Sequence, residues 1–184
     1  KWTDDFLKQY KFPLVSNEER MRFVLKLTLQ NIEKITGGPF GAAVFERESG
    51  QLVSVGVNVV LKQGCSAAHA EMMAIMLAQQ ELGTHDLGIA ELPEFQLVTS
   101  GKMCAMCLGS VVWSGVREVL ASAQPEDVEN IVGFDEGPAP ADYDQQLEKR
   151  GISIIPSFLR EEGCAVLQRY VDLEGVVYNP SRNS

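Results

Sequence analysis

Residues 95–123, FQLVTSGKMCAMCLGSVVWSGVREVLASA, decide the fold that the sequence predicts. The apolar run Phe95–Thr99 is typical of a short buried strand, and a second such run covers Glu118–Ala123. Between them, Cys104–Trp113 has the length and the apolar spacing of a helix. The stretch therefore predicts a strand–helix–strand unit, which is typical of an α/β protein.

A long helix precedes this unit in the predicted fold. Ser16 and Glu19 have the spacing of a capping box, and apolar residues recur at helical intervals over residues 17–36. The glycine pair 37–38 ends this pattern. We therefore expect the first core helix to cover residues 17–36.

A hairpin and a second helix are expected between that helix and the strand–helix–strand unit. Gly41–Phe45 and Leu52–Val59 are apolar runs joined by a polar turn that contains Gly50, which is typical of a hairpin. From about Ala68 to Gln80 the chain has the small and apolar residues of a buried helix. We expect Ser66 to cap that helix.

Beyond the Pro-rich loop 137–140, the sequence predicts one more strand and a final helix. Gly151–Ile155 is the strand, and Ser157 is expected to cap a helix that extends to about Tyr170. With these elements the fold class is α/β. We expect a three-layer α/β/α sandwich in which a mixed five-stranded sheet has helices on both faces.

Length and composition indicate a single domain. The 184 residues are 45% hydrophobic, which is enough for one substantial core. We expect one domain over residues 1–184, with residues 137–184 as a C-terminal extension. No stretch approaches the roughly 18 to 20 apolar residues of a membrane span, and the first residues are too polar for a signal peptide, so we expect a soluble, cytoplasmic protein without a membrane partner.

The charge balance disfavours a nucleic-acid partner. The chain has 16 Lys and Arg against 25 Asp and Glu, a formal net charge of -9, and its basic residues are scattered. Such a charge distribution repels a polyphosphate. The four cysteines are too few for a disulfide scaffold, and the Cys-x-x-Cys pair among them indicates metal binding or redox chemistry in a reducing compartment.

Two short motifs predict a metal centre, HAE at residues 69–71 and CAMC at residues 104–107, each at the start of a predicted helix. Zinc binds imidazole nitrogen and thiolate sulfur in tetrahedral geometry, and a catalytic site uses three protein ligands so that water takes the fourth position. One histidine and two cysteines meet that count: His69, Cys104 and Cys107. Glu71 follows the histidine by two residues and can take a proton from the water.

A purely structural zinc site is the alternative. Cys65 could supply a fourth ligand and close the coordination shell, and a closed site is inert. We favour the catalytic interpretation because the closed site gives Glu71 no role and because both motifs begin predicted helices.

The pairing of His-x-Glu with Pro-Cys-x-x-Cys is the signature of zinc nucleobase deaminases, and apart from the proline this chain resembles the cytidine deaminase superfamily, in particular its guanine deaminase branch. The matching segments include GGPFGAAVF (37–45), AAHAEMMAI (67–75), MCAMCLGSVVWSGV (103–116) and GFDEGP (133–138). The resemblance implies zinc-dependent hydrolytic deamination of a free nucleobase, most simply guanine to xanthine and ammonia, or of a related purine or triazine such as ammeline. A transfer-RNA-type deaminase and a non-catalytic zinc module are the alternatives.

The resemblance also implies substrate contacts. Asn58 is similar to the asparagine that hydrogen-bonds the edge of the base, and Phe40 and Trp113 are similar to aromatic residues around the ring. The backbone N–H of Ala70, beside the metal, is suited to orienting a ring substituent. Without the resemblance, a strand end, a core aromatic residue and a helix end are the simpler interpretations of the first three positions.

The segment GFDEGP resembles one that brings a second carboxylate to the leaving amino group in some guanine and ammeline deaminases. Asp135 or Glu136 would then assist proton transfer, and we select Glu136. A solvated acidic turn is the alternative. The resemblance further implies a homodimer whose C-terminal segments can exchange, which would place Tyr178 over the partner's pocket.

One pair of adjacent residues departs from the family pattern. Lys102-Met103 stands where the family usually has Glu-Pro before the first cysteine. Without the proline, the backbone that enters the ligand loop is less restricted, and the lysine reverses a charge near the expected pocket. All three ligands remain, so we expect metal binding to be retained and substrate preference to be affected.

Overall fold

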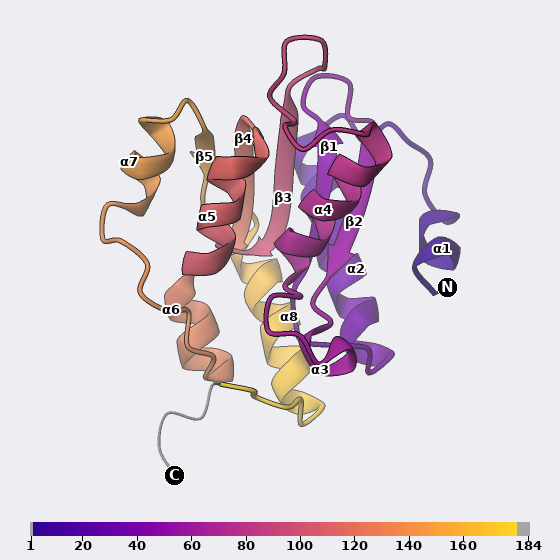
Figure 1. Ribbon diagram of the computed structural model, residues 1–184. Coiled ribbons are helices and arrows are strands. Elements are labelled where there is room, and N and C mark those ends of the chain that lie inside the picture. The colour runs from indigo at the N-terminus through magenta and orange to yellow at the C-terminus, as the bar shows by residue number, and fades with distance from the viewer. Residues whose placement is uncertain (1, 180–184) are drawn as a thin grey trace.

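A five-stranded mixed sheet forms the centre of the computed structural model, which describes residues 2–179 (Figure 1). The strand order is β2-β1-β3-β4-β5. Strands β2, β1 and β3 pair antiparallel, whereas β3, β4 and β5 pair parallel. The strands are β1 (Gly41–Glu46), β2 (Leu52–Val57), β3 (Phe95–Gly101), β4 (Glu118–Ala123) and β5 (Ser153–Ile155). The predicted mixed five-stranded sheet is confirmed.

The central strands are buried along their length. Every residue of β3 and β4 is buried, and in β1 every residue except Glu46. Continuous buried strands of this kind are typical of sheets that lie between two helical layers. Leu97 of β3 and Val119 of β4 are partners in the parallel pairing, as the strand–helix–strand unit over residues 95–123 requires.

Two helical layers cover the sheet. Helices α2 (Asn17–Glu33) and α8 (Arg160–Asp172) pack on one face. Helices α4 (Ala70–Leu82) and α5 (Ala105–Ser114) pack on the other and lie in front of the strands in Figure 1. Separate hydrophobic clusters fill the two sides. The predicted three-layer sandwich is confirmed.

Several short helices were not predicted from the sequence. They are α1 (Trp2–Leu7), α3 (Val60–Gln63), α6 (Pro125–Asp127), the π-helix η1 (Val128–Val132) and α7 (Tyr143–Glu148). Elements this short do not span enough turns to show a helical period in the sequence. No helix among the described residues is long and apolar enough to cross a membrane.

The residues beyond position 137 complete the same sheet. Strand β5 pairs with β4, and Ile154 is the partner of Val119. Helix α8 contacts α2, β4 and η1. The C-terminal extension therefore supplies one edge of the sheet and part of its helical cover.

The start of α2 follows the sequence prediction, and the start of α4 does not. Ser16 and Glu19 form the reciprocal capping box before α2, which ends at Glu33, slightly earlier than predicted. Ser66 does not cap α4, because the preceding loop continues and the helix begins after His69, whose side chain makes no capping hydrogen bond.

The predicted cap of the last helix is also wrong. The Phe158 N–H donates to the Ala121 carbonyl of β4, so the chain follows the sheet beyond Ser157. Helix α8 starts only at Arg160, with Leu159 in the left-handed region at φ 51° as its N-cap.

Candidate functional site

The beginnings of α4 and α5 bring the two sequence motifs together. His69 is the N-cap of α4 and Cys104 is the N-cap of α5. His69 Nδ1 lies 3.5 Å from Cys104 Sγ and 3.6 Å from Cys107 Sγ. The potential ligand atoms of the three residues all lie within 4.8 Å of one another. Three side chains that are separated in the sequence thus converge on one point.

The chemistry of these donors fits zinc. Hydrogen bonds from the Cys107 thiol and the His69 ring lower the pKa of the Cys104 thiol to about 4. The pKa of Cys107 is raised, because its hydrogen bond with Cys104 and its burial oppose a second negative charge. Two adjacent sulfurs can both ionise only beside a cation, and zinc prefers one imidazole and two thiolates of this kind.

Cys65 takes no part in this cluster. It is exposed, and within the described part of the chain the group that could hold a metal consists of His69, Cys104 and Cys107. The closed four-ligand site is therefore wrong, and the three ligands leave one side of the centre facing a pocket.

Glu71 is buried beside the ligands. It lies in the first turn of α4 and is 5% exposed. Cys107 Sγ lies 3.5 Å from its Oε2, and the Thr99 hydroxyl lies 3.4 Å from its Oε1. Burial, followed by the charge of Cys104, raises the pKa of the Glu71 carboxyl. A carboxyl with a raised pKa holds a proton more readily than a free one, which suits it to proton transfer.

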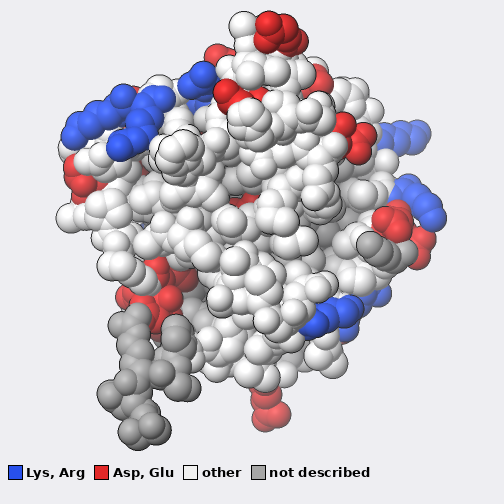
Figure 2. All heavy atoms as spheres, viewed as in Figure 1, with Lys and Arg blue, Asp and Glu red and all other residues white. Residues whose placement is uncertain are grey.

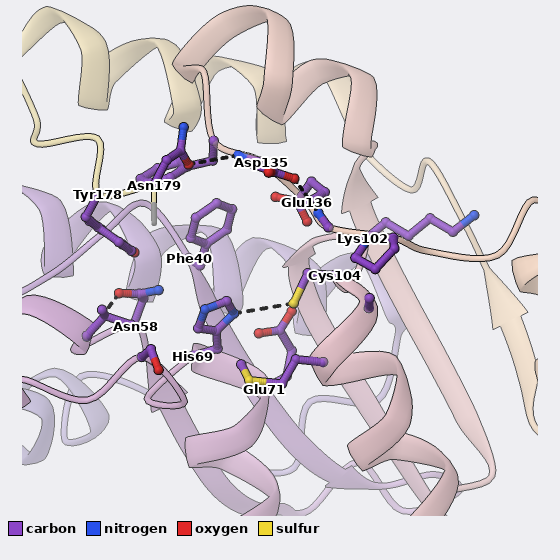
Figure 3. Close-up of a pocket in the computed structure, with 17 residues that line it drawn as sticks. Phe40, Asn58, His69, Glu71, Lys102, Cys104, Asp135, Glu136, Tyr178 and Asn179 are labelled. Atoms are coloured by element: carbon purple, nitrogen blue, oxygen red, sulfur yellow. Dashed lines mark hydrogen bonds between the residues drawn. The ribbon is translucent and has the colours of Figure 1, made fainter. Parts of the chain in front are cut away.

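A cavity of about 390 Å³ lies directly against this centre (Figure 3). Its lining brings together most of the predicted site residues: Phe40, Asn58, His69, Glu71, Cys104, Asp135, Glu136 and Tyr178. Ala70 is fully buried and is not in the lining. Trp113 is not in the lining, and its side chain is 86% exposed near the end of α5.

Asn58 and Phe40 form one wall of the cavity. The Asn58 N–H donates to the Phe40 carbonyl at 3.0 Å, and the Asn58 side-chain oxygen accepts from the Val60 N–H at 3.3 Å. Asn58 is buried, so these contacts hold its amide at a fixed place in the pocket. Figure 3 shows the Phe40 ring between Asn58 and the loop that carries Glu136.

The segment GFDEGP (133–138) places its two carboxyl groups, those of Asp135 and Glu136, in different surroundings. Asp135 accepts a hydrogen bond from the Gly137 N–H at 2.8 Å and so closes its own turn. Glu136 is more buried, and burial, followed by the negative charges of Cys104 and Glu71, raises its pKa to about 8. Glu136 is therefore the carboxyl that is suited to exchange a proton with a ligand in the pocket.

Tyr178 lies over the pocket of its own chain. Its ring centroid is 4.8 Å from that of Phe134, and its hydroxyl is buried. The neighbouring Asn179 side chain donates to the Gly133 carbonyl and accepts from the Asp135 N–H. The end of the described chain is thereby fastened to the segment that carries Glu136.

Lys102 is turned away from the metal centre. Its ammonium pairs with Asp144 at 2.7 Å and lies 4.5 Å from the centre of the Tyr143 ring. Figure 3 shows the side chain extending away from His69. Next to it, Met103 is buried in the core. Lys102 is thus part of the cavity lining, but its ammonium is paired with Asp144.

Four residues that shape the site were not found from the sequence: Asn31, Thr99, Phe134 and Asn179. Each acts through a partner that is distant in the chain, and no local motif marks Asn31, Thr99 or Asn179. A signal was available only for Phe134, which lies in the GFDEGP segment.

The sequence matches the family model of the "Cytidine and deoxycytidylate deaminase zinc-binding region" over residues 15–123. This segment contains both metal motifs and the first four strands of the sheet.

Individual relatives extend the similarity to most of the chain. The guanine deaminase of Bacillus subtilis (strain 168) is 29% identical over 147 residues, which cover 80% of this chain and 89% of the relative. The solved structure of guanine deaminase from Nitrosomonas europaea is 49% identical with a TM-score of 0.85 and covers 90% of this chain and 91% of that chain. The structure of NE0047 in complex with 2,6-diaminopurine is 48% identical with a TM-score of 0.87. The match covers 96% of this chain and 93% of that chain.

Family model, fold and metal centre agree with one another. The predicted resemblance is confirmed, and the chain belongs to the cytidine and deoxycytidylate deaminase family of zinc-dependent aminohydrolases.

Proposed function

We propose that this protein deaminates guanine to xanthine and ammonia, with amino-substituted purines and triazines such as ammeline as related substrates. One observation carries the proposal: two carboxyl groups, Glu71 and Glu136, line one pocket beside the three potential zinc ligands. The similarity to guanine deaminases supports guanine as the base. The complex of NE0047 with 2,6-diaminopurine supports a purine with an amino group at position 2.

The proposed chemistry begins with water and Glu71. When bound by His69, Cys104 and Cys107, zinc supplies a Lewis acid that makes water nucleophilic at neutral pH. The Glu71 carboxylate takes a proton from the water and delivers it to the ring nitrogen next to the reacting carbon. Its burial and raised pKa allow it to hold that proton between the two steps.

The leaving group needs a further proton. The oxygen of water forms a bond to ring carbon 2, the bond from that carbon to the amino nitrogen breaks, and the nitrogen leaves as ammonia. Glu136, whose pKa is raised first of all by burial, donates a proton to the departing nitrogen. It then recovers the second proton of the water, so that guanine and water give xanthine and ammonia.

The remaining site residues hold the base. The Asn58 amide contacts the polar edge of the base, and the Phe40 ring packs against its plane. The backbone N–H of Ala70 orients a ring substituent near the metal. Tyr178 covers the outer side of the base.

The pocket is less suited to a nucleic acid. Lys102 is the one basic residue in its described lining, and that ammonium pairs with Asp144. A polynucleotide requires a basic path for its phosphates, which the net charge of -9 does not favour. Titration with single-stranded RNA at low salt should therefore show no binding, and tight binding would support the transfer-RNA-type alternative.

Ammonia release from a panel of bases tests the proposal. The panel contains guanine, ammeline, cytosine, adenine, guanosine and pterins, and each is assayed with the wild type and with Glu71→Gln at equal zinc content. We expect turnover of guanine that is lost in the variant. If no base releases ammonia although one zinc is bound per chain, the protein is a non-catalytic zinc module.

We also propose a homodimer that buries the α4 and α5 side of the molecule. Four apolar side chains on these helices are exposed: Met76, Leu77, Met106 and Trp113. Figure 2 views this side and shows that charged residues lie mainly around its rim. Apolar patches with a polar rim are typical of protein interfaces. Sedimentation should give a dimer for the wild type and a monomer for Trp113→Lys.

Exchange of the C-terminal extension, residues 137–184, within that dimer remains part of the proposal. Residues 180–184 lie outside the described part of the chain. Mixed dimers of one Glu71→Gln subunit and one Tyr178→Ala subunit test it, because exchange places both defects in one pocket and leaves the other intact.

The cytoplasm is the proposed compartment, since the ligand cysteines must stay reduced, and cell fractionation tests it.

A further inference from the structure

A buried asparagine on α2 joins the two segments that form one wall of the pocket. Asn31 is fully buried in the last turns of α2. Its side-chain Nδ2 donates to the Gly38 carbonyl at 2.9 Å and to the Asn58 carbonyl at 3.0 Å. One amide group therefore connects the loop before β1 to the loop after β2.

The orientation of this amide is fixed from its other side. The Thr36 hydroxyl lies 2.6 Å from Asn31 Oδ1 and donates to it. Because the oxygen is used as an acceptor, the NH₂ group must face the two carbonyls. Every polar atom of the Asn31 side chain thus has a partner in the buried interior, where an unpaired group is costly.

The two joined segments approach too closely to be separated by a side chain. A Cβ atom at Gly37 would clash with the Asn58 carbonyl oxygen, and one at Gly38 would clash with the Tyr178 hydroxyl. Asn58 also donates its N–H to the Phe40 carbonyl. The positions of Asn58 and Phe40 in the pocket therefore depend on each other and on Asn31.

We propose that Asn31 is a positioning residue that sets substrate affinity by holding the Asn58 amide at the edge of the base. This inference rests on the proposed function for the identity of the ligand. Asn31 does not line the pocket and is not one of the metal ligands. Its removal should weaken base binding and leave zinc binding unchanged.

Equilibrium binding of 2,6-diaminopurine tests the affinity. All variants carry Glu71→Gln and one zinc per chain, so that no turnover occurs. We expect Asn31→Leu to raise the dissociation constant at least tenfold. The matched control is Thr28→Val, which removes a fully buried hydrogen bond within the same helix and should change the constant less than twofold.

A double-mutant cycle identifies the route of the effect. On an Asn58→Ala background, Asn31→Leu should add less than a twofold loss of affinity, because its target is already absent. An unchanged tenfold loss on that background would show that Asn31 acts elsewhere and would overturn the proposal. If Asn31→Leu does not fold, Asn31→Asp replaces it in both experiments, because the aspartate keeps the shape of the side chain and removes the Nδ2 donors.

Amide hydrogen exchange gives a readout that needs no ligand. In Asn31→Leu, the N–H groups of Asn58 and Val60 should exchange at least tenfold faster, whereas those of Leu97 and Val98 in β3 should change little. Uniform acceleration would mean that Asn31 only stabilises the whole fold, and the proposal would be wrong. If the exchange and binding results hold but wild type releases no ammonia from guanine, the proposed function fails and the positioning role stands.

Discussion

The two walls of the pocket are built in different ways. The metal wall, formed by His69, Glu71, Cys104 and Cys107, stands on the first turns of two helices that pack on the central sheet. The loop wall, formed by Phe40, Asn58, Glu136 and Tyr178, stands on connecting segments. Regular elements fix the first wall, and side-chain contacts across the chain fix the second.

This difference separates chemistry from recognition. In the proposed mechanism the metal wall binds zinc and moves the first proton, and both tasks need a fixed geometry. In the same proposal the loop wall contacts the outer parts of the base and, through Glu136, supplies the proton for the leaving nitrogen. Changes to the metal wall should therefore abolish the reaction, whereas changes to the loop wall should alter affinity and rate by degrees.

The largest expected effect comes from a ligand of the metal wall. Cys107→Ser should abolish stoichiometric zinc binding, since structural and catalytic zinc depend on the full ligand set, and should reduce deamination below detection. Zinc content by mass spectrometry of the native protein checks this. Cys65→Ala is the control and should keep one zinc per chain, because Cys65 lies outside the cluster. Zinc retained in Cys107→Ser would contradict the ligand assignment.

A carboxyl of the loop wall should give a smaller effect. Glu136→Gln removes the proton donor for the leaving nitrogen, and we expect kcat to fall by about 100-fold, as for loss of one general acid. Zinc content should not change. Asp135→Asn is the neighbouring control and should lower kcat by less than about fivefold, because Asp135 closes its own turn. Equal losses in the two variants would refute the choice of Glu136.

The cover of the pocket should affect mainly affinity. Tyr178→Ala removes an aromatic ring that packs on Phe134, and we expect KM for guanine to rise by about tenfold with kcat changed by less than about threefold. Tyr178→Phe keeps the ring and should behave like the wild type. Steady-state kinetics distinguishes the two. A fall in kcat with unchanged KM would place Tyr178 in the chemical step.

The smallest expected effect concerns the ion pair between α8 and α6. Arg160 on α8 donates to both carboxylate oxygens of Asp127, at 2.7 and 2.8 Å, and these bonds lower the pKa of Asp127. Asp127→Asn should cost about 1 kcal/mol of unfolding free energy at pH 7, because the pair is partly solvated.

The sign of the pH dependence follows from the lowered pKa. The contribution of Asp127 is complete above its unfolded pKa of about 4 and is lost as pH falls through the lower folded value. Wild type and Asp127→Asn should therefore converge in stability in acid, as denaturant unfolding at pH 7 and pH 3 can show. If the difference in unfolding free energy were the same at pH 7 and pH 3, the charge of Asp127 would not be the source of the stabilisation.

The metal wall was predictable from the sequence, because its residues lie in short motifs whose spacing is set by the metal and by the helix. His69 and Glu71 are two residues apart, and the cysteines are one turn apart. The sheet was predictable for a similar reason, since buried strands are marked by continuous apolar runs.

The arrangement of the loop wall was not predictable from the sequence alone. Asn31 contacts Asn58 across 27 positions, and Asn179 contacts Gly133 across 46. Such contacts arise only when the fold brings distant segments together. The exposure of the Trp113 side chain was not predictable either, because the helical period of α5 does not show which side of the helix faces the pocket.

The order of the strands has a consequence for synthesis on the ribosome. β5 is the last strand among the described residues, and it pairs with β4, which is completed at Ala123. A nascent chain that has emerged only to this point already contains all three zinc ligands but presents β4 as an open edge, which invites pairing with other chains. Early capture of the metal would stabilise this incomplete chain while the segment that carries β5 and α8 is still being translated.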